Sequence, residues 1–171
     1  MDILSQLAPH PNIAGVKLTC ANAGKVTTLT AQFPPDQFAV FSGQSDWLTP
    51  CLIGGGVGCV TGNGNVFPKS VSQIYRLWQA GKIEEARKLQ SLVALAESAC
   101  KKGLSATKFG AAHFAGPAAG VHAMEAFAPR KPYKHANTEL QQSTIKTMTV
   151  LADLEKSLPD FVVHAKANGT S

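Results

Sequence analysis

The chain has 171 residues, of which 44% are hydrophobic and 16% charged, a composition typical of a globular domain rather than of a disordered protein. No apolar run approaches the roughly 18 residues of a membrane-spanning helix. The net charge is +5. The lysines and arginines form short groups without interleaved aromatic residues, so we expect them to lie on a solvated surface rather than on a nucleic-acid-binding face. A further interpretation is that some of these charges attract an anionic substrate.

Three short apolar segments are predicted to be buried strands, namely residues 13–20, 38–42 and 56–62. Between the first two, Asn22 is placed to cap a helix that runs to about Gln32, with Val26 and Leu29 on its inner face. Strands that alternate with helices in this way indicate a parallel sheet covered by helices.

Two further helices belong to this first unit. Ser45 could cap a short helix in "SDWLTPCLIGG", which Pro50 should limit or kink. A longer helix is predicted to begin at Pro68. We therefore expect residues 1–80 to form the α/β part of the chain.

The rest of the chain is predicted to be helical. Apolar residues keep helical spacing from Ile83 to a stop at Gly103, and two short helices are expected over 105–114 and 118–127. Asn137 could cap a last amphipathic helix. We expect residues 81–160 to form a C-terminal helical extension and 161–171 a tail.

One lysine stands inside the first predicted strand, in "AGVKLTC". Lys17 either extends to solvent or sits in a pocket where burial would favour its neutral amine. A neutral amine can attack a ketone and form a Schiff base. In a parallel sheet functional groups gather at the carboxyl ends of the strands, where the other two predicted strands end in Ser42-Gly43 and Thr61-Gly62.

Other site types find less support in the sequence. The run "GGGVGCVTGNGN" has no G-x-G-x-x-G match, so nucleotide binding is not expected. The histidines lack metal-ligand spacing, and no metal or cofactor is predicted. The four cysteines form no C-x-x-C pair and are interpreted as reduced core residues of a cytoplasmic protein. The first eleven residues contain an early acid and no basic segment, so no signal peptide is expected.

The segments "HPNIAGVKLTC", "FAVFSGQSDWL", "GGGVGCVTGNGNVFP", "GKIEEARKLQ" and "PRKPY" together resemble the dihydrodipicolinate synthase and N-acetylneuraminate lyase superfamily, in particular its 4-hydroxy-2-oxoglutarate aldolase-like branch. Their order and spacing fit along residues 2 to 135. The resemblance implies a partial (β/α)₈ barrel, holding family strands six to eight, followed by a helical extension.

The resemblance also implies a site. The family's Schiff-base lysine falls on Lys17, its substrate-contacting Ser-Gly pair on Ser42 and Gly43, and its strand-eight contacts on Val60 and Thr61. The implied substrate is a 2-keto acid such as pyruvate, used without a cofactor.

Two family features find no match in this sequence: the G-T-T-G-E-like turn that binds the substrate carboxylate, and the proton-relaying tyrosine of strand five. Tyr75 and Tyr133 lie in other contexts. The leading interpretation is therefore that this chain is the C-terminal portion of a lyase and that catalytic activity of the chain alone is doubtful. Alternatives are a non-catalytic subunit that pairs with a full-length relative, and a half-barrel completed as a homo-oligomer, because open strand edges favour association.

Overall fold

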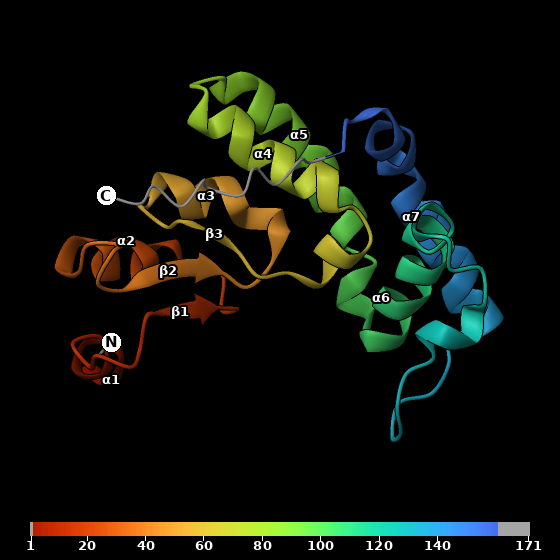
Figure 1. Cartoon of the computed structure of the whole chain (residues 1–171), viewed down its shortest axis with the longest axis horizontal. Helices are drawn as coiled ribbons and strands as arrows, with labels where there is room; N and C mark the ends of the chain where they lie inside the picture. The colour runs from red at the N-terminus through yellow and green to blue at the C-terminus, as the bar shows by residue number, and fades with distance from the viewer. Residues whose placement is uncertain (1, 161–171) are drawn as a thin grey trace, which may run out of the picture.

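The computed structural model describes residues 2–160. Its sheet has three parallel strands in the order β1 (Gly15–Leu18), β2 (Ala39–Ser42) and β3 (Gly58–Cys59) (Figure 1). The predicted strands are confirmed in place but are shorter than expected, since only residues that face a neighbouring strand make ladder hydrogen bonds. The arrangement is that of part of a parallel α/β fold.

Short helices precede and join the strands: α1 (Asp2–Leu7), α2 (Ala23–Gln32) and α3 (Leu48–Ile53). The Asn22 cap is confirmed, because its Oδ1 accepts a hydrogen bond from the Lys25 amide at 2.9 Å. The prediction that Ser45 caps a helix is wrong. Ser45 opens a 3₁₀ turn, Ser45–Trp47, and its hydroxyl has a different partner, described below.

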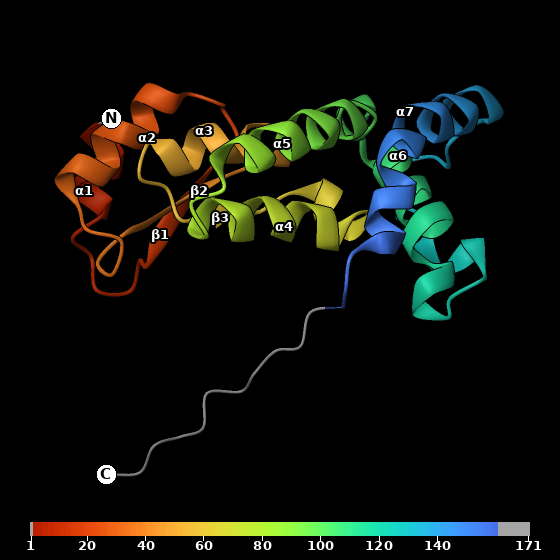
Figure 2. The ribbon, with the colours of Figure 1, turned by 90° about the horizontal axis from the view of Figure 1, so that it is seen from above.

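Four longer or later helices complete the described chain: α4 (Pro68–Gln79), α5 (Ile83–Glu97), α6 (Leu104–Gly110) and α7 (Thr138–Ser157). Helices α4 and α5 lie side by side, and α7 packs across both (Figures 1 and 2). The predicted cap at Asn137 is confirmed by a 2.9 Å hydrogen bond from the Leu140 amide.

The helix predicted over residues 118–127 does not form. Two 3₁₀ turns, Pro117–Ala119 and Met124–Phe127, stand there instead. Gly120 lies between them with φ of 72°, in the left-handed region that an α-helix cannot accommodate. The predicted helix over 105–114 is present as α6 and a following π-helical turn, Ala111–Ala115.

The apolar core has two parts. One lies against the sheet and includes Leu18, Val26, Leu29, Val40 and Cys51. The larger part joins α3 and α4 to α5, to the π-helical turn after α6 and to α7, so it continues across residue 80. Its largest fully buried side chains are Phe67, Leu48, Ile74, Met148 and Leu151. The helical extension is therefore packed directly on the α/β part.

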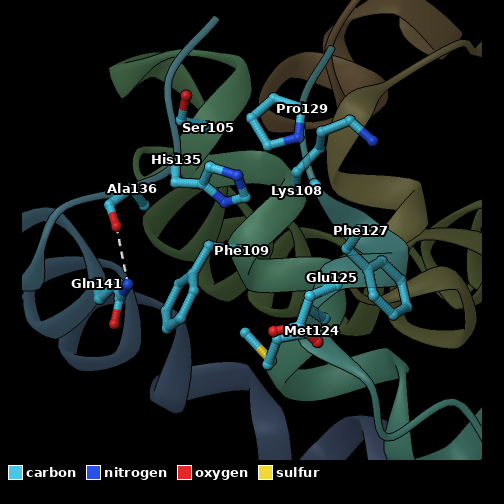
Figure 3. Close-up of a pocket in the computed structure, with 12 residues that line it drawn as sticks. Ser105, Lys108, Phe109, Met124, Glu125, Phe127, Pro129, His135, Ala136 and Gln141 are labelled. Carbon is cyan, nitrogen blue, oxygen red and sulfur yellow. Dashed lines mark hydrogen bonds between the residues drawn. The ribbon is translucent and has the colours of Figure 1, made fainter.

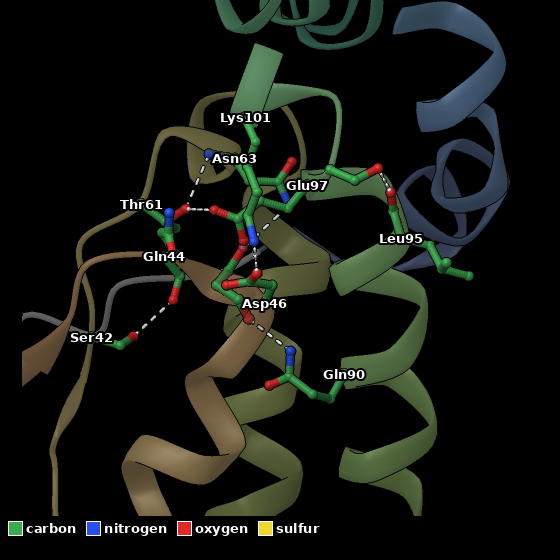
Figure 4. Close-up of polar contacts among 11 residues, drawn as sticks. Ser42, Gln44, Asp46, Thr61, Asn63, Gln90, Leu95, Glu97 and Lys101 are labelled. Carbon is green, nitrogen blue, oxygen red and sulfur yellow. Dashed lines mark hydrogen bonds and ion pairs between the residues drawn. The ribbon is translucent and has the colours of Figure 1, made fainter. Parts of the chain in front are cut away.

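A buried carboxylate connects the extension to the loops that follow β2 and β3. Glu97, at the end of α5, is only 3% exposed. Its Oε2 accepts a hydrogen bond from the Ser45 hydroxyl at 2.5 Å, and its Oε1 accepts one from the Thr61 hydroxyl at 2.8 Å (Figure 4). One side chain of the extension therefore ties together two loops of the sheet.

Neighbouring polar groups extend this connection. On α5, Gln90 accepts a hydrogen bond from the Thr49 amide at 2.8 Å and donates one to the Ser45 carbonyl at 2.7 Å. Lys101 forms an ion pair with Asp46 (Figure 4), and that hydrogen bond raises the pKa of Lys101. The segment after β2 is thus held at three positions, Ser45, Asp46 and Thr49.

The strands at both ends of the sheet keep an open edge. Within residues 2–160, no strand pairs with the outer side of β1 or of β3. A cavity of about 290 Å³ runs beside β3, lined among others by Phe41, Gly58 and Tyr75. Unpaired strand edges next to apolar surface favour association with another chain.

Replacing Glu97 should destabilise the fold strongly. In Glu97→Ala the buried hydroxyl of Ser45 and the part-buried hydroxyl of Thr61 lose their acceptor. We expect a loss of about 2–4 kcal/mol in the free energy of unfolding. Asp153→Ala is the matched control, because Asp153 is an exposed helical carboxylate; it should change stability by less than about 0.5 kcal/mol. Urea titration followed by circular dichroism measures the stability of both variants. Equal losses in the two variants would contradict the structural role of Glu97.

The isolated chain should associate in solution. The two open strand edges and the cavity beside β3 provide the surface for pairing. Light scattering after size-exclusion chromatography, at several protein concentrations, should give a mass above that of one chain. A sharp monomer peak that persists on concentration, combined with a cooperative melting transition, would contradict this expectation.

Candidate functional site

The two faces of the sheet carry different side chains. Strand register aligns Leu18, Ser42 and Cys59 in one row, on the face toward the helices, where Leu18 is 6% exposed and Ser42 fully buried. It aligns Lys17 and Phe41 with Gly58 in the neighbouring row, and side chains of neighbouring rows point to opposite faces. Lys17 therefore belongs to the face that the helices leave uncovered.

Lys17 is exposed in the described structure. The sequence left open whether this lysine extends to solvent or lies in a pocket, and within residues 2–160 its side chain is open to solvent. Gly15, two residues earlier, allows a close approach to β2, since a Cβ there would lie 2.2 Å from the Ala39 carbonyl oxygen. The position of Lys17 in the sheet is thus tightly fixed, although its amine is open to solvent.

The side chains of Ser42 and Thr61 do not lie beside Lys17. Ser42 donates its hydroxyl to the Gln44 carbonyl at 2.9 Å, and Thr61 donates to Glu97. Both hydroxyls shape the strand-end loops rather than face the uncovered side. The substrate contacts predicted for Ser42 and Thr61 stay predictions.

Gly43 and Val60 lie at the carboxyl ends of β2 and β3. A Cβ on Gly43 would lie 2.2 Å from the hydroxyl oxygen of Thr19, so no larger residue fits there without a rearrangement. The Gly43 amide donates to the Leu18 carbonyl at 2.7 Å, and the Val60 amide donates to the Ser42 carbonyl at 2.8 Å. Val60 is 51% exposed.

The structure adds Thr19 and Glu97 to the residues that shape these strand ends. The sequence signal for Thr19 was its position two residues after Lys17, which places it on the same face of β1. Glu97 could not have been found from spacing, because its partners precede it by 52 and 36 residues.

Two of the half-buried cysteines are poor nucleophiles at neutral pH. Burial and the nearby charge of Glu97 raise the pKa of Cys59 to about 11, and burial raises the pKa of Cys100 to about 11. Cys51 is buried as predicted, whereas the prediction of a core position is wrong for Cys20, which is exposed. Cys20 follows the last residue of β1, Leu18, and so lies outside the packed part of the strand.

Across residues 2–160, no group of three metal-binding side chains is close enough to hold an ion. In the same part of the chain, none of the helices has the length and apolar character needed to cross a membrane.

Residues 1–151 match the Dihydrodipicolinate synthetase family. Among curated proteins, the chain is 46% identical to a putative mitochondrial 4-hydroxy-2-oxoglutarate aldolase from Coccidioides immitis, over 92% of this chain and 51% of that protein. It is 30% identical to an L-threo-3-deoxy-hexylosonate aldolase from Aspergillus niger, over 94% of this chain and 52% of that protein.

Solved structures give the same correspondence. A putative dihydrodipicolinate synthase family protein from Coccidioides immitis matches with a TM-score of 0.86 and 44% identity, over 92% of this chain and 52% of that chain. A putative dihydrodipicolinate synthase from Thermus thermophilus matches with a TM-score of 0.75 at 22% identity, over 90% of this chain and 50% of that chain. The chain therefore spans about half the length of these relatives, and, from its family match over residues 1–151 and its agreement in sequence and fold, it belongs to the dihydrodipicolinate synthetase family.

Proposed function

We propose that this chain carries the Schiff-base lysine and part of the substrate site of an aldolase or synthase that acts on 2-keto acids such as pyruvate. The observation that carries the proposal is the position of Lys17 on the uncovered face of β1, within a chain that belongs to the dihydrodipicolinate synthetase family. The chain also corresponds to about half of two relatives that are named as aldolases.

The proposed reaction begins at the ε-amine of Lys17. The neutral amine attacks the ketone carbon, and the carbinolamine loses water to form an imine. The protonated imine withdraws electrons from the neighbouring carbon and so supports the making or breaking of a carbon–carbon bond there. Hydrolysis returns the amine and releases the keto acid.

The proposed substrate contacts lie along the carboxyl ends of the other two strands. Ser42 and Gly43 end β2, and Val60 and Thr61 follow β3. Since the two hydroxyls already have protein partners, the backbone at these positions and the Val60 side chain would border the substrate. No cofactor is required by this chemistry.

The location and organisation of the protein are further parts of the proposal. We propose that residues 1–80 form the partial barrel and 81–160 the extension, with a tail over 161–171, which lies outside the described residues. The cysteines favour a reducing compartment such as the cytoplasm, whereas two fungal relatives are named as mitochondrial proteins.

A non-catalytic role is the alternative. The open edges of β1 and β3 and the cavity beside β3 fit a subunit that pairs with a full-length relative or with a second copy. Co-expression with a full-length relative tests it: co-purification of both chains at a fixed ratio supports the subunit, and exclusive self-association favours the homo-oligomer.

Lys17 should be the residue that pyruvate labels. Incubation with pyruvate followed by borohydride reduction should leave a stable adduct on Lys17, detected by mass spectrometry of peptides. Lys17→Ala should abolish the adduct, and Lys146→Ala, which removes an exposed lysine of α7, should leave it unchanged. Labelling at another lysine, or unchanged labelling in Lys17→Ala, would contradict the proposal.

Aldol turnover by this chain alone should be negligible. General acid–base help contributes roughly 10²–10⁴-fold, and neither Tyr75 on α4 nor Tyr133 in the loop before α7 occupies β1 to β3. Pyruvate release from 4-hydroxy-2-oxoglutarate and from 2-keto-3-deoxy sugar acids is the measurement, with Lys17→Ala as the blank. A rate of about 1 s⁻¹ or more, within the ordinary range of enzymes, would contradict this expectation.

A further inference from the structure

An apolar cavity of about 290 Å³, which we call the α4–α7 cavity, lies where the helical extension meets the start of α4. Val66 and Phe67, which precede α4, form one wall. Phe114 and Ala118 from the turns after α6 form a second wall, and Ala152 of α7 forms a third. Figure 2 shows the end of α7 beside the start of α4, so segments that are distant in the sequence border one space.

The polar groups at the rim of the α4–α7 cavity are Lys69, Glu155 and Lys156. Glu155 Oε1 accepts a hydrogen bond from the Lys69 amide at 2.9 Å. Its Oε2 accepts two from Ser70, from the amide at 2.7 Å and from the hydroxyl at 2.6 Å. The ammonium of Lys69 is also bonded, as described below, and Lys156 is exposed. The cavity therefore suits an apolar occupant, because its walls are hydrocarbon and its rim carboxylate is already satisfied.

The smaller cavity beside α6 has a different character. Its volume is about 110 Å³, and Lys108, Glu125 and His135 contribute charged or polar side chains to its lining (Figure 3). Gln141 and the Ala136 carbonyl, joined by a hydrogen bond of 2.8 Å, belong to the same lining. An apolar segment of the chain therefore finds its better match in the α4–α7 cavity.

The end of the described chain passes over the rim of the α4–α7 cavity. The ammonium of Lys69 donates a hydrogen bond to the Leu158 carbonyl at 3.1 Å and lies 2.6 Å from Asp160 Oδ1. Because Lys69 also lines the cavity, these two contacts lead the backbone after α7 to its edge. The next three residues in the sequence, 161–163, are Phe-Val-Val and lie outside the described residues.

Proximity favours this apolar segment over other occupants. Phe161 directly follows Asp160, and neighbouring Cα atoms are about 3.8 Å apart. An apolar group on so short a tether competes at an effective concentration on the order of millimolar or more, which a second copy of the chain does not reach in dilute solution. An aromatic ring also fits, since an apolar cavity of about 150 Å³ can hold benzene and the α4–α7 cavity is larger.

The ion pair between Lys69 and Asp160 does not hold the segment by itself. The Asp160 side chain is 91% exposed, and exposed ion pairs contribute little to stability because water competes for both charges. Burial of an aromatic ring is the larger favourable contribution that is available to this part of the chain.

We propose that the α4–α7 cavity binds the side chain of Phe161, and that the segment after α7 thereby holds α7 against the start of α4. Helix α4 follows the 3₁₀ turn Gly62–Asn65, which itself follows β3. The segment after α7 therefore stabilises the contact between the helical extension and the α/β part. This inference goes beyond the proposed function, because it requires neither a substrate nor an imine.

Removing the ring should lower the stability of the full chain. We expect Phe161→Ser to lower the melting temperature by about 3 °C or more, because a buried aromatic side chain is lost. Phe161→Leu keeps an apolar side chain and should stay within about 2 °C of the wild type. Tyr133→Ser is the matched control, since Tyr133 is 56% exposed, and it should change the melting temperature by less than about 1 °C. Circular dichroism at one protein concentration measures all three variants.

Nuclear magnetic resonance locates the ring independently of stability. In the full chain with ¹³C-labelled alanine methyl groups, the signals of Ala118 and Ala152 should show nuclear Overhauser contacts to the ring of Phe161. Both signals should shift in Phe161→Ser. The methyl signal of Ala23, at the start of α2, should stay unchanged.

Three results would overturn the proposal. The first is the absence of these contacts in the wild-type chain, and the second is a melting temperature of Phe161→Ser equal to that of the Tyr133→Ser control. The third is contacts that arise only between differently labelled copies of the chain, because the cavity would then bind the segment of a second copy.

Discussion

The carboxylate of Glu97 is the group on which the arrangement of the strand-end loops depends. The strands are too short to fix these loops, since β3 pairs over only Gly58 and Cys59. Glu97 supplies acceptors to the hydroxyls that follow β2 and β3. A buried carboxylate is unfavourable unless its oxygens are hydrogen-bonded, so the sheet loops and α5 can form this contact only together.

The same contact explains why the extension is not an independent appendage. The larger part of the core continues from α3 and α4 into α5 and α7, which gives the non-directional part of the interface. Two hydrogen bonds of Gln90 give the directional part: its side chain donates to the Ser45 carbonyl and accepts from the Thr49 amide of α3. Apolar packing alone would tolerate sliding of α5 along α4, whereas a buried hydrogen-bonded pair has one favourable register.

Much of the fold could be predicted from the sequence because it depends on local rules. Asn22 and Asn137 cap their helices as expected, since an Asx side chain satisfies a free amide in any context. Ser45 is also a residue type that often caps helices, but its hydroxyl donates to Glu97, 52 positions later in the chain. Gly120 ended a helix that apolar spacing had predicted, because one left-handed residue outweighs that pattern. For the site, motif resemblance selected Lys17, Gly43 and Val60, whereas Glu97 became visible only when the end of α5 and the loops after β2 and β3 were placed side by side.

The exposure of Lys17 has a chemical consequence. A lysine forms an imine readily when desolvation favours its neutral amine, and the residues of 2–160 leave this side chain open to solvent. The relatives that this chain matches are about twice as long, so in a chain of that length further segments are available to cover the face of Lys17. The helical extension meets the strand ends where α6 and the turn after β3 line one cavity. Glu97 joins the strand-end loops to the end of α5, and so it fixes how the helical extension lies against the ends of β2 and β3.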